Sequence, residues 1–132
     1  MIYFCVERDG TLNGIPVTDE ISRLYETITR EKLIGPAGIG FNCNSPNLTG
    51  EVLSSLPADI RRMVLGIHPN ASSERDPRQY AKMTDLHAIP EQEYVSILAG
   101  LQREFNIPII GGCCGTNHET MRQLSNSAQQ HL

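Results

Sequence analysis

The thiols of Cys113 and Cys114 are the side chains of this chain best suited to bind a metal. They lie in the run Gly111-Gly112-Cys113-Cys114-Gly115-Thr116, directly after the apolar stretch Ile107-Pro108-Ile109-Ile110. An apolar strand that ends in a turn is typical of the carboxyl edge of a parallel sheet, where α/β proteins bind ligands. Neighbouring strand residues point to opposite faces, so both thiols reach one ion only if the backbone leaves the extended conformation, which the glycines permit. The alternative is that both cysteines are small hydrophobes packed at a strand end.

A third cysteine, Cys43, favours the metal interpretation. It follows the short apolar segment Gly38-Ile39-Gly40-Phe41, where the chain runs into a polar turn. Its distance along the chain from Cys113 excludes a compact zinc finger, in which paired ligands lie about two to five residues apart, but suits ligands from two strands of one sheet. Three thiolates leave one tetrahedral position of a zinc ion open, which is typical of catalytic zinc. We therefore predict a Zn²⁺ site formed by Cys43, Cys113 and Cys114.

Other residues near these cysteines have two interpretations each. Asn42 directly precedes Cys43 and either contacts substrate and orients this cysteine or simply forms the turn. The pair Pro69-Asn70 shapes the loop after a strand or contacts substrate, and His68 is a candidate for a further ligand. Cys5 lies in an apolar run, and we interpret it as strand packing.

Length and composition indicate a single domain over residues 1–132. The chain has 132 residues, of which 39% are hydrophobic and 20% charged, enough for one core. Its 11 basic and 15 acidic residues give a net charge of −4, so no nucleic-acid or anionic-membrane partner is expected. Apolar stretches are far shorter than the ~20 residues that span a bilayer, and the first residues do not resemble a signal peptide. We expect a cytoplasmic protein, where clustered cysteines bind metals or act in catalysis more often than they form disulfides.

Strand patterns and helix patterns alternate along the chain. Strands are predicted over residues 1–6, 37–41, 63–67 and 107–110. Helices are predicted after Thr18, from about Thr49, from near Pro90 and after Thr116. Thr116 and Glu119 match a capping box at the start of the last helix. A long polar loop is predicted from His68 to about Ile89. Four strand-then-helix units predict an α/β fold of parallel strands with crossover helices. This is either a small open sheet or about half of an eight-unit barrel, which needs roughly 200 to 250 residues.

Three segments, in order, resemble successive motifs of the homocysteine S-methyltransferase family. They are Gly40-Phe41-Asn42-Cys43, Ile67-His68-Pro69-Asn70-Ala71 and Gly111-Gly112-Cys113-Cys114-Gly115-Thr116. The opening segment around Cys5 and Asp9-Gly10 is similar to the region of the family's fifth strand. The resemblance implies a TIM-type (βα)8 barrel, of which this chain corresponds to the carboxyl-terminal half, about four βα units.

The same resemblance implies the transfer of a methyl group to the thiol of homocysteine to give methionine. Cys43, Cys113 and Cys114 match the family's three zinc-binding cysteines, and zinc makes the substrate thiol a thiolate without a protein base. The implied partners are homocysteine and a methyl donor, with S-methylmethionine or S-adenosylmethionine favoured.

The family's amino-terminal half has no counterpart here, so we expect a half-barrel with exposed sheet edges. Such a chain is a shortened product, one half of a split enzyme that pairs with a complementing amino-terminal half, or a homo-oligomer. The alternative function is a catalytically incomplete zinc-binding or interaction module. A thiol redox role for Cys113 and Cys114 is weaker, because a disulfide between neighbours is strained and no Cys-x-x-Cys is present.

Overall fold

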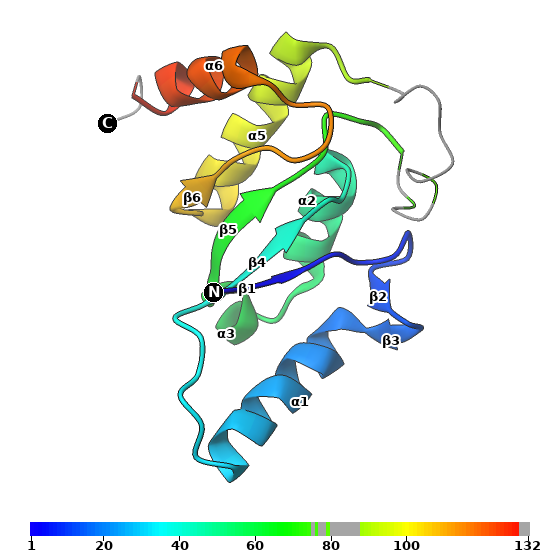
Figure 1. Cartoon of the computed structure of the whole chain (residues 1–132), viewed down its shortest axis with the longest axis vertical. Coiled ribbons are helices and arrows are strands. Elements are labelled where there is room, and N and C mark those ends of the chain that lie inside the picture. Colours follow the sequence, from blue (N-terminus) through cyan, green and yellow to red (C-terminus); the bar gives the residue numbers. More distant parts are fainter. Residues whose placement is uncertain (75, 77–78, 80–87, 130–132) are drawn as a thin grey trace.

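A four-stranded parallel sheet forms the centre of the computed structural model, which describes residues 1–74, 76, 79 and 88–129 (Figure 1). The strands lie in the order β1 (Ile2–Phe4), β4 (Ile39–Asn42), β5 (Val64–His68) and β6 (Ile109–Ile110). The connecting and following helices are α1 (Val17–Arg30), α2 (Pro46–Ser55), α3 (Ala58–Arg61), α5 (Glu91–Phe105) and α6 (His118–Gln129). The predicted α/β class, with parallel strands and helical crossovers, is confirmed, and the arrangement agrees with part of a βα barrel.

Several predicted boundaries differ from the structure. The first and last strands are shorter than predicted, because the chain pairs only over Ile2–Phe4 and Ile109–Ile110. The segment predicted as a turn-rich loop contains a small hairpin of β2 (Thr11–Leu12) and β3 (Ile15–Pro16). Two paired residues per strand are too few to give an alternating pattern in the sequence. About half of the predicted polar loop from His68 to about Ile89 lies outside the described residues.

Helix starts also differ from the prediction, for reasons visible at their caps. The α1 helix begins at Val17 rather than after Thr18, and no side chain caps it. The α2 helix begins at Pro46, three residues before the predicted start, because the Ser45 hydroxyl accepts a hydrogen bond from the Leu48 amide (3.3 Å). Serine at the cap with proline in the first turn is a favoured helix start, and this start leaves only Asn44 and Ser45 between Cys43 and α2.

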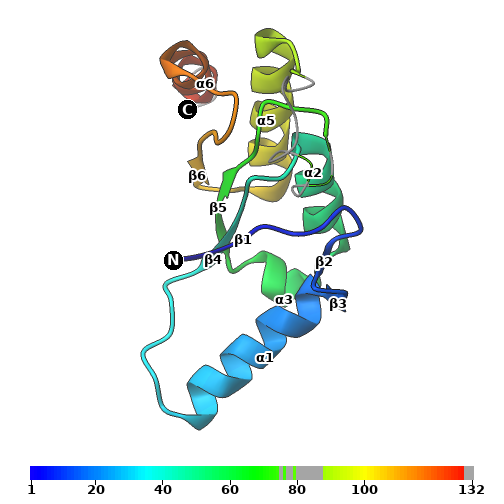
Figure 2. The ribbon, with the colours of Figure 1, turned by 45° about the vertical axis from the view of Figure 1, so that its right-hand side comes forward.

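The helix-covered face of the sheet carries the main core. Phe41 of β4 and Ile67 of β5 are register partners and are fully buried. They belong to the same hydrophobic cluster as Leu48 and Leu53 of α2 and Leu101 of α5. Figure 2 shows α2 and α5 on the same side of the strands. Burial of these side chains at about 25 cal/mol per Å² of apolar surface stabilises the strand ends on which the site is built.

The opposite face of the sheet is more open. The Tyr3 ring lies across Gly40 and Gly66, since a Cβ built at Gly40 would approach Tyr3 Cε1 to 2.5 Å. Met1 and Ile109 lie beside Gly66 on this face, and each is 44% exposed. Apolar surface is therefore left uncovered on the face that lines the interior of a βα barrel. Among the described residues, no helix has the length and apolar character needed to cross a bilayer.

Candidate metal centre

Cys43 leaves the sheet through a left-handed turn directly after β4. Its φ is 56°, a value that few residues other than glycine adopt, and its amide donates to the His68 carbonyl (3.1 Å). This single residue ends the strand alternation and turns the chain toward α2. The local strain is a feature that often accompanies functional sites.

Cys113 and Cys114 follow β6 in a loop held by the chain after β5. The Cys113 amide donates to the Pro69 carbonyl (2.9 Å), and the Ala71 amide donates to the Cys114 carbonyl (2.9 Å). Gly115 has a φ of 78° and turns the chain toward α6. These bonds hold both thiols at the carboxyl edge, where Cys43 also lies.

Glycine is required at the two positions before Cys113 for a different reason from the one predicted. We expected Gly111 and Gly112 to supply unusual backbone angles, but neither has a positive φ among the described residues. A Cβ at Gly111 would lie 2.8 Å from the His68 ring, and one at Gly112 would collide with Thr116. Glycine is needed here because the neighbouring side chains approach the backbone closely.

Asn70 joins the two cysteine loops through one side chain. Its Nδ2 donates to the Cys43 carbonyl (2.8 Å), and its Oδ1 accepts from the Cys114 amide (3.0 Å). The residue is fully buried, and its own amide donates to the Asn44 carbonyl (2.8 Å). These contacts support the interpretation that Pro69-Asn70 shapes the loop.

Two further residues that the sequence analysis did not single out support the same loops. The buried Asn44 side chain accepts from the Val6 amide (3.2 Å) and donates to the Val6 carbonyl (2.7 Å), which ties the end of β1 to the end of β4. The Tyr94 hydroxyl donates to the Pro69 carbonyl (2.8 Å) from α5. Burial, and then the charge of Cys113, raises the pKa of Tyr94 well above its usual value. In the sequence, only its position one residue after a candidate ligand could have identified Asn44. Nothing in the sequence distinguished Tyr94 from an ordinary core aromatic residue.

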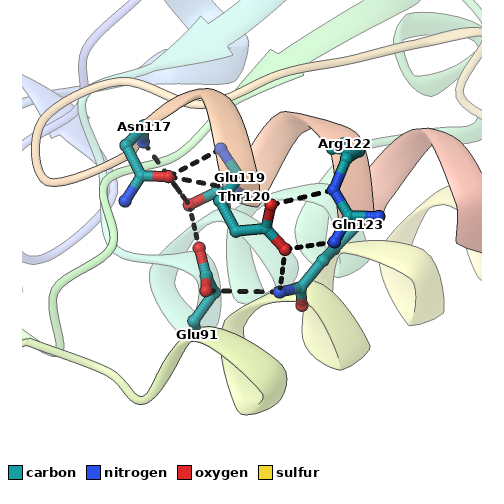
Figure 3. Close-up of polar contacts among 6 residues, drawn as sticks. All are labelled: Glu91, Asn117, Glu119, Thr120, Arg122 and Gln123. Atoms are coloured by element: carbon teal, nitrogen blue, oxygen red, sulfur yellow. Dashed lines mark hydrogen bonds and ion pairs between the residues drawn. The ribbon is translucent and has the colours of Figure 1, made fainter.

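The exit from the cysteine loop is fixed by a polar network between α5 and α6 (Figure 3). The Asn117 side chain accepts from the Glu119 amide (2.8 Å) and from the Thr120 amide (3.1 Å), and thus caps α6. The Thr120 hydroxyl donates to Glu91 at the start of α5 (2.7 Å). The predicted capping box is therefore wrong, because the Thr116 hydroxyl donates to the Cys113 carbonyl instead (2.7 Å).

The three predicted ligand sulfurs come together in space. The Sγ atoms of Cys43, Cys113 and Cys114 all lie within 4.8 Å of one another. Those of Cys43 and Cys113 are 2.7 Å apart, well beyond the about 2.05 Å of a disulfide, and both thiols are free. Sulfurs bound to one tetrahedral ion, each at about 2.3 Å, are about 3.8 Å from one another. The cluster can therefore hold a metal that prefers thiolates.

The electrostatics of the cluster favour a bound cation. Burial, and then the Cys113 thiol, raises the pKa of Cys43 to about 12. Burial and the neighbouring Cys113 also raise the pKa of Cys114. A divalent cation offsets the negative charge that these sulfurs would otherwise place together, so that metal binding and loss of thiol protons are coupled.

The remaining candidates lie at the edge of this cluster. Asn42 is the half-buried last residue of β4 and is opposite His68 in the sheet. The His68 ring stacks on Tyr3, with centroids 4.9 Å apart, and its side chain is outside the metal-ligand group found among the described residues. Cys5 is exposed rather than packed in a strand, because β1 ends at Phe4, so that prediction is wrong.

The fold and the site define an α/β protein whose parallel sheet is consistent with part of a βα barrel and carries, at its carboxyl edge, three thiols that could hold a metal ion. Residues 1–128 match the family model for homocysteine S-methyltransferase, and the chain belongs to this family. The chain is also similar to the methionine synthase of Mycobacterium tuberculosis, with 30% identity over 105 residues. The match covers 79% of this chain and 8% of that relative, so the chain spans only a small part of the larger protein.

Proposed function

We propose that Cys43, Cys113 and Cys114 bind Zn²⁺ and leave one position open for the thiol of homocysteine. The observation that carries this proposal is the convergence of three sulfurs within 4.8 Å from two loops that are far apart in the sequence. Family membership supports homocysteine as the methyl acceptor. When bound, zinc supplies a positive charge that keeps a thiol ionised at neutral pH.

The chain's own residues position this chemistry. Asn70 holds the Cys43 and Cys114 loops together, so both thiols face one point. Asn42 lies directly before Cys43 at the strand end, and we propose that its amide contacts the bound homocysteine. The substrate thiolate attacks the methyl carbon of a donor, the bond from that carbon to the donor's leaving atom breaks, and methionine and the demethylated donor result. S-methylmethionine and S-adenosylmethionine are the donors we favour, because a sulfonium sulfur leaves as a neutral thioether.

We further propose that residues 1–132 are one domain, the metal-bearing half of a (βα)8 barrel. The open face of the sheet supports this, since Met1, Tyr3 and Ile109 lie where a barrel interior is packed. A complementing amino-terminal half or a second copy of the chain would cover this face. The same uncovered face supports the second candidate function, a zinc-binding or interaction module without turnover.

Metal analysis tests the site, and a methylation assay tests the activity. The chain should bind one equivalent of zinc, and Cys43→Ser, Cys113→Ser and Cys114→Ser should each lose it. Ser54→Ala, on the exposed side of α2, is the control and should keep the metal. Full zinc affinity in Cys43→Ser would contradict the shared site.

For turnover, the chain is mixed with homocysteine and S-methylmethionine, with and without an amino-terminal half. Methionine formed only with the added half supports the split enzyme. A folded zinc-loaded chain that forms no methionine in either mixture, also with S-adenosylmethionine, favours the module.

A further inference from the structure

Cys5 lies at the same edge of the sheet as the three clustered thiols. β1 and β4 pair in parallel, with Phe4 opposite Phe41, so the residues after these strands leave the sheet side by side. The two hydrogen bonds between Asn44 and Val6, one donated by each residue, fix this arrangement beyond the strand ends. Cys5 directly precedes Val6, and Cys43 directly precedes Asn44, so the two cysteines are held next to each other.

The Cys5 thiol is weakly held and can rotate away from its present contact. Its Sγ lies 3.9 Å from the Cys43 carbonyl oxygen, which is a weak contact because a thiol is a poor donor. The side chain is exposed, so rotation about its Cα–Cβ bond does not require the core to move. The Cys5 sulfur is not one of the three that already lie within 4.8 Å of one another, so it reaches the cluster only after such a rotation.

We propose that Cys5 supplies a fourth thiol to the metal centre, at the position that Cys43, Cys113 and Cys114 leave open. The proposal rests on the three-cysteine site proposed above. Zinc in proteins is almost always four-coordinate, and four cysteines form a closed site. A chain with a fourth thiol within reach therefore has a resting state in which the metal centre is closed by its own residue.

An incoming substrate thiol then exchanges with Cys5. The incoming sulfur gives up its proton and takes the ligand position, while the Cys5 sulfur leaves and accepts a proton. One metal–sulfur bond breaks and one forms, and neither thiol is oxidised. Cys5 is thus a displaceable ligand that keeps the site closed until a thiol substrate arrives.

Cobalt substitution counts the thiolates directly. The 132-residue chain is titrated with Co²⁺, and the thiolate-to-cobalt charge-transfer absorbance per bound cobalt is compared among wild type, Cys5→Ser, Cys5→Ala and Cys43→Ser. We expect Cys5→Ser and Cys5→Ala to bind cobalt with about a quarter less absorbance, as four thiolates become three. Cys43→Ser should lose tight binding, because it removes one of the three core ligands.

The two proposals fail in different ways in this titration. An unchanged band in both Cys5 variants, together with loss of binding in Cys43→Ser, overturns the role of Cys5 and leaves the three-cysteine site intact. Tight binding retained in Cys43→Ser overturns both proposals.

Alkylation of the zinc-loaded chain gives a second readout that does not depend on substitution. Iodoacetamide is added to the folded protein, and the modified cysteines are mapped by peptide mass spectrometry before and after zinc is removed with a chelator. We expect Cys5 to be protected together with the other three cysteines and to react once zinc is removed. Rapid modification of Cys5 while Cys43, Cys113 and Cys114 stay protected overturns the proposal.

Discussion

Asn70→Ala should separate the two cysteine loops while leaving the core intact. The Asn70 side chain is fully buried, and both its donor and its acceptor are used, toward the Cys43 carbonyl and the Cys114 amide. Alanine removes both bonds and leaves two backbone groups without these partners. None of the side chains in the main hydrophobic cluster is changed by this substitution.

The expected loss in the free energy of unfolding follows from these two hydrogen bonds. Leaving a buried polar group unpaired costs about 1–3 kcal/mol. Both bonds are partly buried, so the lower part of this range applies, about 1–2 kcal/mol for each group and about 2–4 kcal/mol for the two. This is a large part of the about 5–15 kcal/mol by which a domain is stable. With a urea m-value of about 2 kcal/mol/M, the unfolding midpoint should fall by about 1–2 M. Metal affinity should fall as well, by about 10- to 100-fold, as for other residues that position ligands.

Urea unfolding of the chain with and without zinc measures both effects. Asn47→Ala, an exposed asparagine in the first turn of α2, is the matched control and should change stability by no more than about 0.5 kcal/mol. An Asn70→Ala protein with the unfolding midpoint and zinc affinity of wild type would refute the reasoning. A loss of stability without any loss of zinc affinity would show that the loops hold their positions independently.

Three further outcomes are expected at the helices around the site. Thr120→Val removes the hydroxyl that donates to Glu91 and should lower the free energy of unfolding by about 1–2 kcal/mol in a urea titration. Burial raises the pKa of Tyr94, so its phenol stabilises the fold fully below its unfolded pKa of about 10 and progressively less above it. The urea unfolding midpoint should therefore fall between about pH 8 and about pH 11, and this fall should be larger in wild type than in Tyr94→Phe. Hydrogen bonds from Arg122 lower the pKa of Glu119 to about 2, so its contribution is present above about pH 4.3 and is lost toward pH 2. That loss should be small, because the pair is exposed, and absent in Glu119→Gln.

Most of the fold could be predicted because its elements have strong local patterns. The α5 helix begins one residue after the predicted Pro90, and Tyr94, Leu98 and Leu101 are buried as helical spacing requires. The short hairpin and the early start of α2 could not be predicted as readily. The hairpin has too few residues to show a period, and the start of α2 depends on a cap that competes with several nearby polar residues.

The gathering of the three thiols could be predicted from the sequence, but the residues that support them could not. Cys113 and Cys114 alone could also have been packed at a strand end, and Cys43 was the residue that favoured a shared group, which is now found together. Asparagine is common in turns for purely local reasons, so nothing in the sequence distinguished the bridging role of Asn70 from that of a turn residue. Only the three-dimensional placement of two distant loops shows that one amide serves both.

The choice of asparagine as the support follows from the two backbone groups that it must satisfy. An amide donates and accepts at once, so Asn70 satisfies a carbonyl from one loop and an amide from another. A carboxylate would lack the donor for the Cys43 carbonyl and would add negative charge beside a thiol whose pKa is already raised to about 12. A lysine could donate to the Cys43 carbonyl but has no acceptor for the Cys114 amide. The neutral amide holds the two loops in place without adding charge beside the Cys43 thiol.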